Sequence, residues 1–363
     1  MKEYLDGILR YAVNIGASDI HLKPNKPPIL RVSAQLVTVE ADAPTDTDMK
    51  SIAEAIIPDF LQDKFKQERE VDFSYFAPDV GRFRTNIYTQ RGQINLAMRH
   101  VKGKVPDFNS LNLPEVLKKI AMSERGIIFV AGATGSGKST TLACMLEYVN
   151  NHDKCHVITM EDPIEFVFED KQCVINQREV GLDTLSFRAG LKNVLRQDPD
   201  IIMVGEMRDS ESFSAAITAA ETGHLVMTTV HSNTAPQTIT RVLDFFPMDE
   251  RVQIMRALSG CLTAIICQRM IPAKTGGAVP GIEILINTPI VRKLLEEGKL
   301  EKLGSAIETG ADDGMQSFNQ SILKHIKAGL VTEEDGLAKA SNPDQLKMNL
   351  KGIFLDEGRR IIG

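Results

Sequence analysis

The stretch Gly132-Ala133-Thr134-Gly135-Ser136-Gly137-Lys138-Ser139 decides the fold of this chain. It matches the phosphate-binding loop pattern G-x-x-x-x-G-K-[ST] at every fixed position. The apolar run 126–131 before it predicts a buried strand, and apolar residues at helical spacing over 140–149 predict a helix. A strand, a glycine turn and a helix start together present backbone N–H groups to a polyphosphate. The loop therefore predicts binding of ATP or GTP.

Two side chains of the loop have distinct predicted roles. The Lys138 ammonium is expected to reach the β- and γ-phosphates, and the Ser139 hydroxyl is expected to be a ligand of Mg²⁺. The predicted nucleotide-binding residues are Gly132, Ala133, Thr134, Gly135, Ser136, Gly137, Lys138, Ser139 and Thr140.

Length and composition limit the class of protein. A length of 363 residues suggests two domains, with three still possible. A net charge of −6 argues against nucleic acid as the main ligand. The first residues have no apolar signal-peptide core, and the longest uncharged apolar stretch, 257–267, is too short to span a membrane. The five cysteines include no C-x-x-C pair and indicate reduced thiols, so the expected compartment is the cytoplasm.

The pattern of apolar residues changes near residue 110. Residues 1–101 predict a small α+β domain, 102–110 a linker, and 111–363 an α/β domain with a parallel sheet and a helical tail from Pro289. Within the first domain we expect a helix over 1–15, a strand over 19–22, an extended stretch over 29–39, a helix over 46–57 and alternating strands over 71–101.

Four apolar runs of the second domain end in polar residues. They end in the phosphate loop, in the acidic stretch Glu161–Glu165, at Glu206 and at His231. In an open α/β sheet the ligand lies outside the carboxyl ends of parallel strands, so these four ends are predicted to surround one nucleotide.

Each polar residue also has a structural interpretation. Glu206 follows the four apolar residues 201–204 and Gly205 at the end of a predicted strand, which favours the Walker B role of holding the Mg²⁺-bound water over helix capping. Asp162 and Asp209 fit capping and function equally well. Either Glu161 or Glu165 is expected to polarise the attacking water.

The two histidines of this region differ in position. His231 ends its strand where a γ-phosphate would lie, which favours a sensing or hydrogen-bonding role over a core position. For His224, at the start of the same strand, a buried structural position is nearly as good an interpretation.

The chain resembles the bacterial secretion ATPase superfamily, and within it the PilT/PilU-like twitching-motility retraction ATPases. The resemblance lies in the loop, the acidic box Glu161-Asp-Pro-Ile-Glu165, the Walker B stretch Gly205-Glu-Met-Arg-Asp209 and the histidine box 222–231. Gly16-Ala-Ser-Asp-Ile-His21, Gly81-Arg-Phe-Arg84 and Gly314-Met-Gln316 fit as well, so nearly the whole length is covered. The short sequences at 132–135, 178–184 and 245–247 look more similar to those of the PilU branch.

The resemblance implies an N-terminal PAS-like domain, a RecA-like P-loop core and a homo-hexameric ring. Such a ring would use ATP and Mg²⁺ to drive pilus disassembly through an inner-membrane platform protein, together with a paralogous retraction ATPase in some systems. It would act in the cytoplasm, peripheral to the inner membrane at the pilus base. The resemblance makes Glu165 the general base, Glu206 the Walker B acid, and His224 and His231 the histidine box.

Three arginines of the first domain form a further predicted group. Arg82 and Arg84 alternate along a strand and share a face, and a two-residue hairpin turn at Arg91-Gly92 would place Arg84 opposite Arg99. One interpretation is a solvated face with Asp or Glu partners. The other, to which the resemblance points, is a set of arginine fingers that act on the nucleotide of a neighbouring subunit.

Two alternative functions stay open. One is a pilus assembly or type II secretion ATPase, although those usually carry a four-cysteine zinc insertion and additional N-terminal domains that this sequence does not show. The other is a slow nucleotide-gated adaptor to a paralogous motor. A RecA-type DNA motor is disfavoured by the acidic charge balance.

Overall fold

The computed structural model describes residues 1–33, 35–101, 103 and 105–353, which form an α/β protein. The chain divides into two compact units. The first unit comprises 1–104 with the short segments 163–167 and 179–183, and the second comprises 105–162, 168–178 and 184–363. Residues 102 and 104 of the predicted linker, and 354–363 of the predicted tail, lie outside the described residues.

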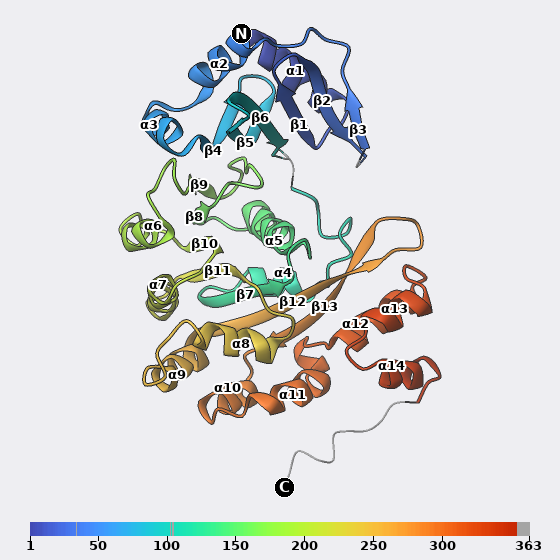
Figure 1. Cartoon of the computed structure of the whole chain (residues 1–363). Helices are drawn as coiled ribbons and strands as arrows, with labels where there is room; N and C mark the ends of the chain where they lie inside the picture. Colours follow the sequence, from blue (N-terminus) through green and yellow to red (C-terminus); the bar gives the residue numbers. More distant parts are fainter. Residues whose placement is uncertain (34, 102, 104, 354–363) are drawn as a thin grey trace. The chain divides into compact units, whose positions relative to one another are not determined.

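The first unit is built on a six-stranded antiparallel sheet with the order β3-β2-β1-β6-β5-β4 (Figure 1). Its strands are β1 (Asp19–Lys23), β2 (Lys26–Val32), β3 (Gln35–Thr38), β4 (Glu70–Ala77), β5 (Gly81–Gln90) and β6 (Gln93–His100). Its helices are α1 (Lys2–Asn14), α2 (Asp46–Ile56) and α3 (Asp59–Glu68).

One face of this sheet is apolar and the other is polar. Along β5, Phe83 and Ile87 are buried in a core that also contains residues of α1 and α2. Because side chains alternate along a strand, Arg82 and Arg84 lie on the opposite face. The first unit therefore has a core on one side of its sheet only.

Most predicted elements of the first unit are confirmed. The helices predicted over 1–15 and 46–57 and the strand over 19–22 are α1, α2 and β1. The extended stretch 29–39 is wrong as a single element, because the chain turns at Ser33 (φ 47°) and forms the antiparallel pair β2 and β3. Helix α3 was not predicted, since it buries no residue and leaves no apolar stripe in the sequence.

The second unit is built on a seven-stranded mixed sheet with the order β13-β12-β7-β11-β10-β8-β9. Strands β12, β7, β11, β10 and β8 are parallel, and β13 is antiparallel to β12. These strands are β7 (Gly126–Gly132), β8 (His156–Glu161), β9 (Val174–Glu179), β10 (Ile201–Glu206), β11 (Leu225–Val230), β12 (Leu262–Pro272) and β13 (Ala278–Ile286).

Helices cover both faces of this sheet (Figure 1). One face packs on α4 (Val116–Ala121) and α5 (Lys138–His152), and the other on α6 (Phe187–Val194), α7 (Ser210–Glu221), α8 (Ala235–Leu243) and α9 (Arg251–Cys261). The tail adds α10 (Pro289–Glu296), α11 (Leu303–Thr309), α12 (Phe318–Lys327), α13 (Glu333–Lys339) and α14 (Pro343–Leu350), with 3₁₀ turns at Leu300–Lys302 and Ala311–Asp313. The predicted parallel sheet and helical tail are confirmed.

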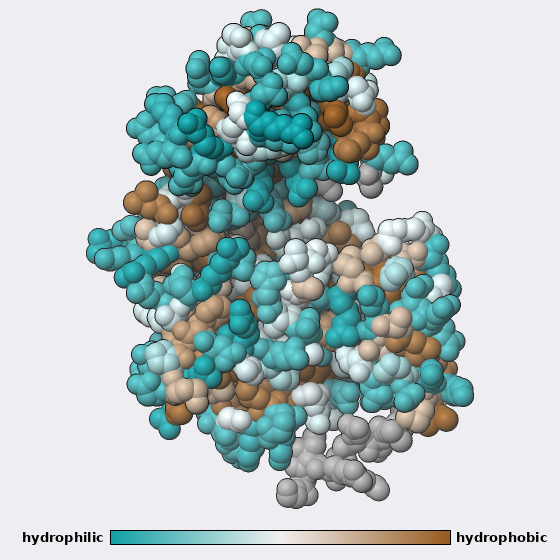
Figure 2. All heavy atoms as spheres, in the orientation of Figure 1, coloured by the Kyte–Doolittle hydropathy of each residue, from teal (hydrophilic) through white to brown (hydrophobic). Residues whose placement is uncertain are grey.

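The face drawn in Figure 2 is mostly hydrophilic, and hydrophobic residues form small groups on it among hydrophilic ones. Large exposed apolar side chains include Leu185 and Met248, which are 92% and 76% exposed. In the part of the chain that the structure describes, no helix is both long enough and apolar enough to cross a bilayer.

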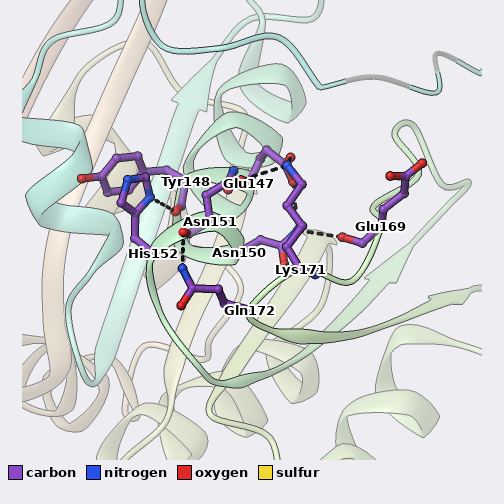
Figure 3. Close-up of polar contacts among 8 residues, drawn as sticks. All are labelled: Glu147, Tyr148, Asn150, Asn151, His152, Glu169, Lys171 and Gln172. Carbon is purple, nitrogen blue, oxygen red and sulfur yellow. Dashed lines mark hydrogen bonds and ion pairs between the residues drawn. The ribbon is translucent and has the colours of Figure 1, made fainter.

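The last turn of α5 is fixed by a polar network with residues 169–172 (Figure 3). Asn150 is fully buried, and its Nδ2 donates to the Glu169 carbonyl at 2.8 Å and to Glu147 Oε2 at 3.1 Å. Its Oδ1 accepts from the Lys171 N–H at 3.2 Å. The Lys171 ammonium also pairs with Glu147 and donates to Asn151 Oδ1 at 2.9 Å. The helix that carries the phosphate loop is therefore anchored at its far end.

We predict that Asn150→Ala destabilises the protein by about 1–3 kcal/mol, because it removes three hydrogen bonds made by a fully buried side chain. The measurement is the denaturant midpoint of unfolding. Asn151→Ala is the matched control, since Asn151 belongs to the same network but is exposed, and its cost should stay within about 0.5 kcal/mol. Equal effects of the two substitutions would contradict a buried anchor at Asn150.

Candidate active site

The phosphate loop connects the end of β7 to the start of α5. Gly132 has φ 156°, and a Cβ there would lie 2.3 Å from Ser136 Oγ and 2.6 Å from the Gln268 carbonyl oxygen. Gly137 has φ 87° and precedes the first residue of α5. Both positions accept only glycine without strain, because one lacks space and both lie at positive φ. The predicted strand, loop and helix are confirmed.

Helix α5 begins without a side-chain cap, so its first N–H groups are available to a ligand at this end. Lys138 is 8% exposed, and its Nζ donates to the carbonyl oxygens of Gly132 and Ala133 at 3.0 Å each. The ammonium is therefore folded back over the loop, where phosphate oxygens would replace the carbonyls as acceptors. This arrangement is suited to a polyphosphate.

Four strand ends meet at one edge of the second unit's sheet. Strands β7, β11, β10 and β8 are neighbours and run parallel, so their carboxyl ends lie together. The loop, His231, Glu206 and Glu161 follow or end these strands. The predicted convergence is therefore confirmed for these residues.

Glu206 is the centre of a small charge cluster. The pairing of β10 with β11 shifts register between Val204 and Glu206, a bulge that re-aims the side chain. His231 Nε2 lies 3.4 Å from Glu206 Oε1, and Arg208 Nη2 donates to Glu206 Oε2 at 2.9 Å. Burial raises the pKa of Glu206, but Arg208, His231 and Lys138 lower it by more, so the pKa lies below its usual value. Glu206 is therefore an ionised carboxylate close to the Arg208 and Lys138 cations.

Arg208 was missed by the sequence analysis as a partner of Glu206. The two residues stand two apart in Gly205-Glu-Met-Arg-Asp209, and their spacing was the available signal. Asp209 accepts hydrogen bonds from Ser212 N and Oγ at 2.8 and 2.9 Å and caps α7, so the capping interpretation is confirmed there.

The two glutamates of the acidic box lie in different environments. Glu161 ends β8 and is 6% exposed, and its Oε1 accepts from Thr159 Oγ1 at 2.7 Å and from Gln177 Nε2 at 3.1 Å. Glu165 lies in 163–167, which belongs to the first unit. The chain thus passes from one unit to the other within the acidic box.

Glu179 holds this segment within the first unit and was also missed. Its Oε2 accepts from Arg82 Nη2 at 2.8 Å, from Ser74 Oγ at 2.7 Å and from the Ile164 N–H at 3.1 Å. The Glu179 side chain is 4% exposed. A buried carboxylate with three donors fixes the backbone next to Glu165 and commits Arg82 to an ion pair. Because Glu179 follows Arg82 by 97 residues, no sequence pattern links them.

The predicted hairpin of the arginine face is confirmed. Arg91 and Gly92 have φ 54° and 77°, and Arg84 lies directly opposite Arg99. Arg99 donates to Asp19 Oδ1 at 2.8 Å. Burial raises the pKa of Asp19, but Ser18, Arg99 and Arg31 lower it by more, so its pKa lies below its usual value.

Arg84 differs from the other two arginines. It is exposed, and the described part of the chain gives it no ion pair. With Asp19, Arg99 and other residues of the polar face it lines a cavity of about 210 Å³. Acidic partners are therefore observed for Arg82 and Arg99, and Arg84 lies exposed on the same face without an ion pair in the described residues.

His224 lies apart from the other predicted residues. It precedes β11, at the opposite edge of the sheet from His231. Its Nδ1 lies 2.9 Å from the Ala219 carbonyl oxygen and 3.3 Å from Thr222 Oγ1, at the end of α7. These contacts connect the end of α7 to the start of β11. A catalytic role for His224 stays a prediction.

The comparisons with known proteins agree with this site. Residues 92–296 match the family model described as Type II/IV secretion system protein. The chain is 42% identical to "Type IV pilus retractation ATPase PilT" of Pseudomonas aeruginosa, over 93% of this chain and 98% of that protein. It is 37% identical to "Type IV pilus ATPase PilU" of the same organism, over 95% and 90%. These identities give no support to a closer similarity to the PilU branch.

A solved structure agrees with the sequence comparison. It is titled "Crystal Structure of the Pilus Retraction Motor PilT and Bound ADP" and has a TM-score of 0.87 at 40% identity, covering 94% of this chain and 98% of that chain. The similarity includes the phosphate loop and both units. The chain therefore belongs to the type II/IV secretion system ATPase family and, within it, to the type IV pilus retraction ATPases.

Proposed function

We propose that this chain is a hexameric motor ATPase that couples ATP hydrolysis to the retraction of type IV pili. The main support for this function is the position of the phosphate loop next to the Glu206 cluster. The chain is also similar to PilT over nearly the full length of both proteins. The second unit is the RecA-like core, and the first unit, an antiparallel sheet with helices on one face, is PAS-like.

Each residue of the site has a separate role in the proposed hydrolysis reaction. Lys138 neutralises charge on the β- and γ-phosphates, and Glu165 orients and deprotonates the attacking water. Glu161 supports the acidic box instead, since its Oε1 already accepts two hydrogen bonds. His231, 3.4 Å from Glu206, senses the γ-phosphate from the end of β11.

Mg²⁺ is the expected metal. Ser139 in the first turn of α5 and Glu206 at the end of β10 supply hydroxyl and carboxylate oxygen atoms, the donor type that Mg²⁺ prefers. The low pKa of Glu206 fits a group that stays ionised. Bound there, the ion would supply charge neutralisation between the β- and γ-phosphate oxygens.

The partners follow from the proposed activity. The motor acts as a homo-hexamer on a pilus inner-membrane platform protein at the cytoplasmic face of the inner membrane, together with a paralogous retraction ATPase in some systems. In the ring, Arg84 acts as an arginine finger on the next subunit's nucleotide, because Arg82 and Arg99 are committed to Glu179 and Asp19. A pilus assembly or secretion ATPase and a slow adaptor are the alternative functions.

The central test is retraction in a piliated bacterium that lacks its own retraction ATPase. This chain should restore twitching, and Lys138→Ala should not. Recovery of pili in a strain that lacks its assembly ATPase would favour the assembly alternative.

In vitro, Lys138→Ala should lower phosphate release at least about 10²-fold, because the loop loses its cation. Lys154→Ala, an exposed lysine of the same unit, is the control and should match the wild type.

We predict that Glu165→Gln and Glu206→Gln fail in different ways. Glu165→Gln should stop phosphate release while ATP still binds, because binding depends on the loop. Glu206→Gln should in addition raise the Mg²⁺ concentration needed for half-maximal ATP binding. Fluorescent-ATP titrations at several Mg²⁺ concentrations measure both. An equal loss of ATP binding in the two variants would contradict this division of roles.

We predict that two inactive variants complement each other in a mixed ring. Lys138→Ala has a defective loop and an intact Arg84, whereas Arg84→Ala has the reverse. Mixed under subunit exchange, they should form some composite sites and release phosphate faster than either parent. Arg91→Ala, an exposed arginine at the hairpin turn of the same sheet, should be active alone. An Arg84→Ala variant as active as the wild type would rule out the finger.

A further inference from the structure

Strand β12 brings a buried glutamine against the phosphate loop. Gln268 pairs in register with Gly132, because β12 runs parallel to β7. Its neighbours Ile266 and Ala264 belong to the cluster on the α5 face, whereas Cys267 and Ile265 belong to the cluster on the other face. Since side chains alternate along a strand, Gln268 points to the side on which α5 begins.

The side chain of Gln268 lies close to the first residue before α5. A Cβ at Gly137 would lie 3.9 Å from Gln268 Nε2. The side chain is 4% exposed, so it is as buried as the surrounding core. A carboxamide in this position is close enough to respond to the conformation of the loop.

Two buried oxygen atoms at the loop are unsatisfied. Among the residues that the structure describes, Gln268 Oε1 and Ser136 Oγ are both buried and make no hydrogen bond. Ser136 Oγ and the Gln268 backbone oxygen both approach Gly132, on which a Cβ would lie 2.3 and 2.6 Å from them. Buried polar atoms without partners are rare and destabilising, so their retention calls for an explanation.

The two atoms are complementary. A carboxamide oxygen accepts a hydrogen bond, and a serine hydroxyl can donate one. A rotation of either side chain is a small change compared with the rearrangement of a loop. We propose that Gln268 is a positioning residue of the nucleotide site, whose Oε1 accepts a hydrogen bond from the Ser136 hydroxyl when the loop closes around the phosphates.

Through the proposed hydrogen bond, the affinity of the loop for nucleotide depends on a residue of β12. The bond gives both buried oxygen atoms a partner in the loaded loop, so it stabilises the nucleotide-bound state. Gln268 acts through the loop and does not touch the reacting atoms. The inference rests on nucleotide binding at this loop and is independent of the type of pilus movement.

The test is a double-mutant cycle on the affinity for a fluorescent ADP analogue. Gln268→Met keeps the side-chain volume and removes the acceptor, and Ser136→Ala removes the donor. Each should weaken ADP binding about three- to tenfold, the size expected for one hydrogen bond. Combined, they should weaken it no more than the stronger single substitution, because both remove the same bond. For Gln268→Met, kcat at saturating ATP should change less than about twofold while KM rises.

Gln316→Met is the matched control. Gln316 is also a buried glutamine of the second unit, and its amide is satisfied by the Ile282 carbonyl and by Lys324. It pairs with Ile284 of β13, so β12 separates it from β7. The control should lower the melting temperature and leave ADP affinity unchanged.

Three results would overturn the proposal. They are unchanged ADP affinity in Gln268→Met, multiplicative effects of the two substitutions, and an equal loss of affinity in Gln316→Met. Wild-type protein that fails to bind ADP would instead contradict the proposed function, so the two failures are distinguishable.

Discussion

The absence of space at Gly132 is the constraint on which the nucleotide site depends. At this residue β7 ends, the chain turns back over Ser136, and the backbone of β12 comes within contact distance. A methyl group there would separate all three, and the start of α5 would move with them. Because α5 is also anchored at its other end through Asn150, the loop is held between two fixed points. Close packing at Gly132 and the hydrogen bonds of Asn150 therefore fix the two ends of α5.

Parallel pairing explains why distant parts of the chain serve one site. The carboxyl ends of β7, β8, β10 and β11 lie at one edge, so Lys138, Glu161, Glu206 and His231 gather there without any long-range recognition between side chains. The bulge before Glu206, the hydrogen bond from Arg208 and the nearby His231 then set the position and pKa of one carboxylate. The order of the strands brings these residues to one edge, and contacts with neighbouring side chains determine the charge state of Glu206.

Strand β12 connects the loop to the helical tail. Gln268 faces the start of α5, while the next residue, Arg269, lies with its guanidinium 3.5 Å from the ring centroid of Phe318 on α12. Arg269 also donates to the Lys339 carbonyl of α13 at 2.7 Å. Adjacent residues of one strand therefore contact the nucleotide loop and two tail helices.

The sequence by itself determined the phosphate loop, the parallel sheet, the position of Glu206 at the end of a strand and the hairpin that places Arg84 opposite Arg99. These features depend on local rules: glycine at positive φ, apolar runs of strand length, and alternation of side chains. Only the tertiary structure decided that Glu179 holds Arg82 and the segment next to Glu165, and that Gln268 lies against the loop. These contacts join residues about 15 to more than 100 positions apart. Since each one depends on how strands are ordered and not on any nearby residue, no local pattern records it.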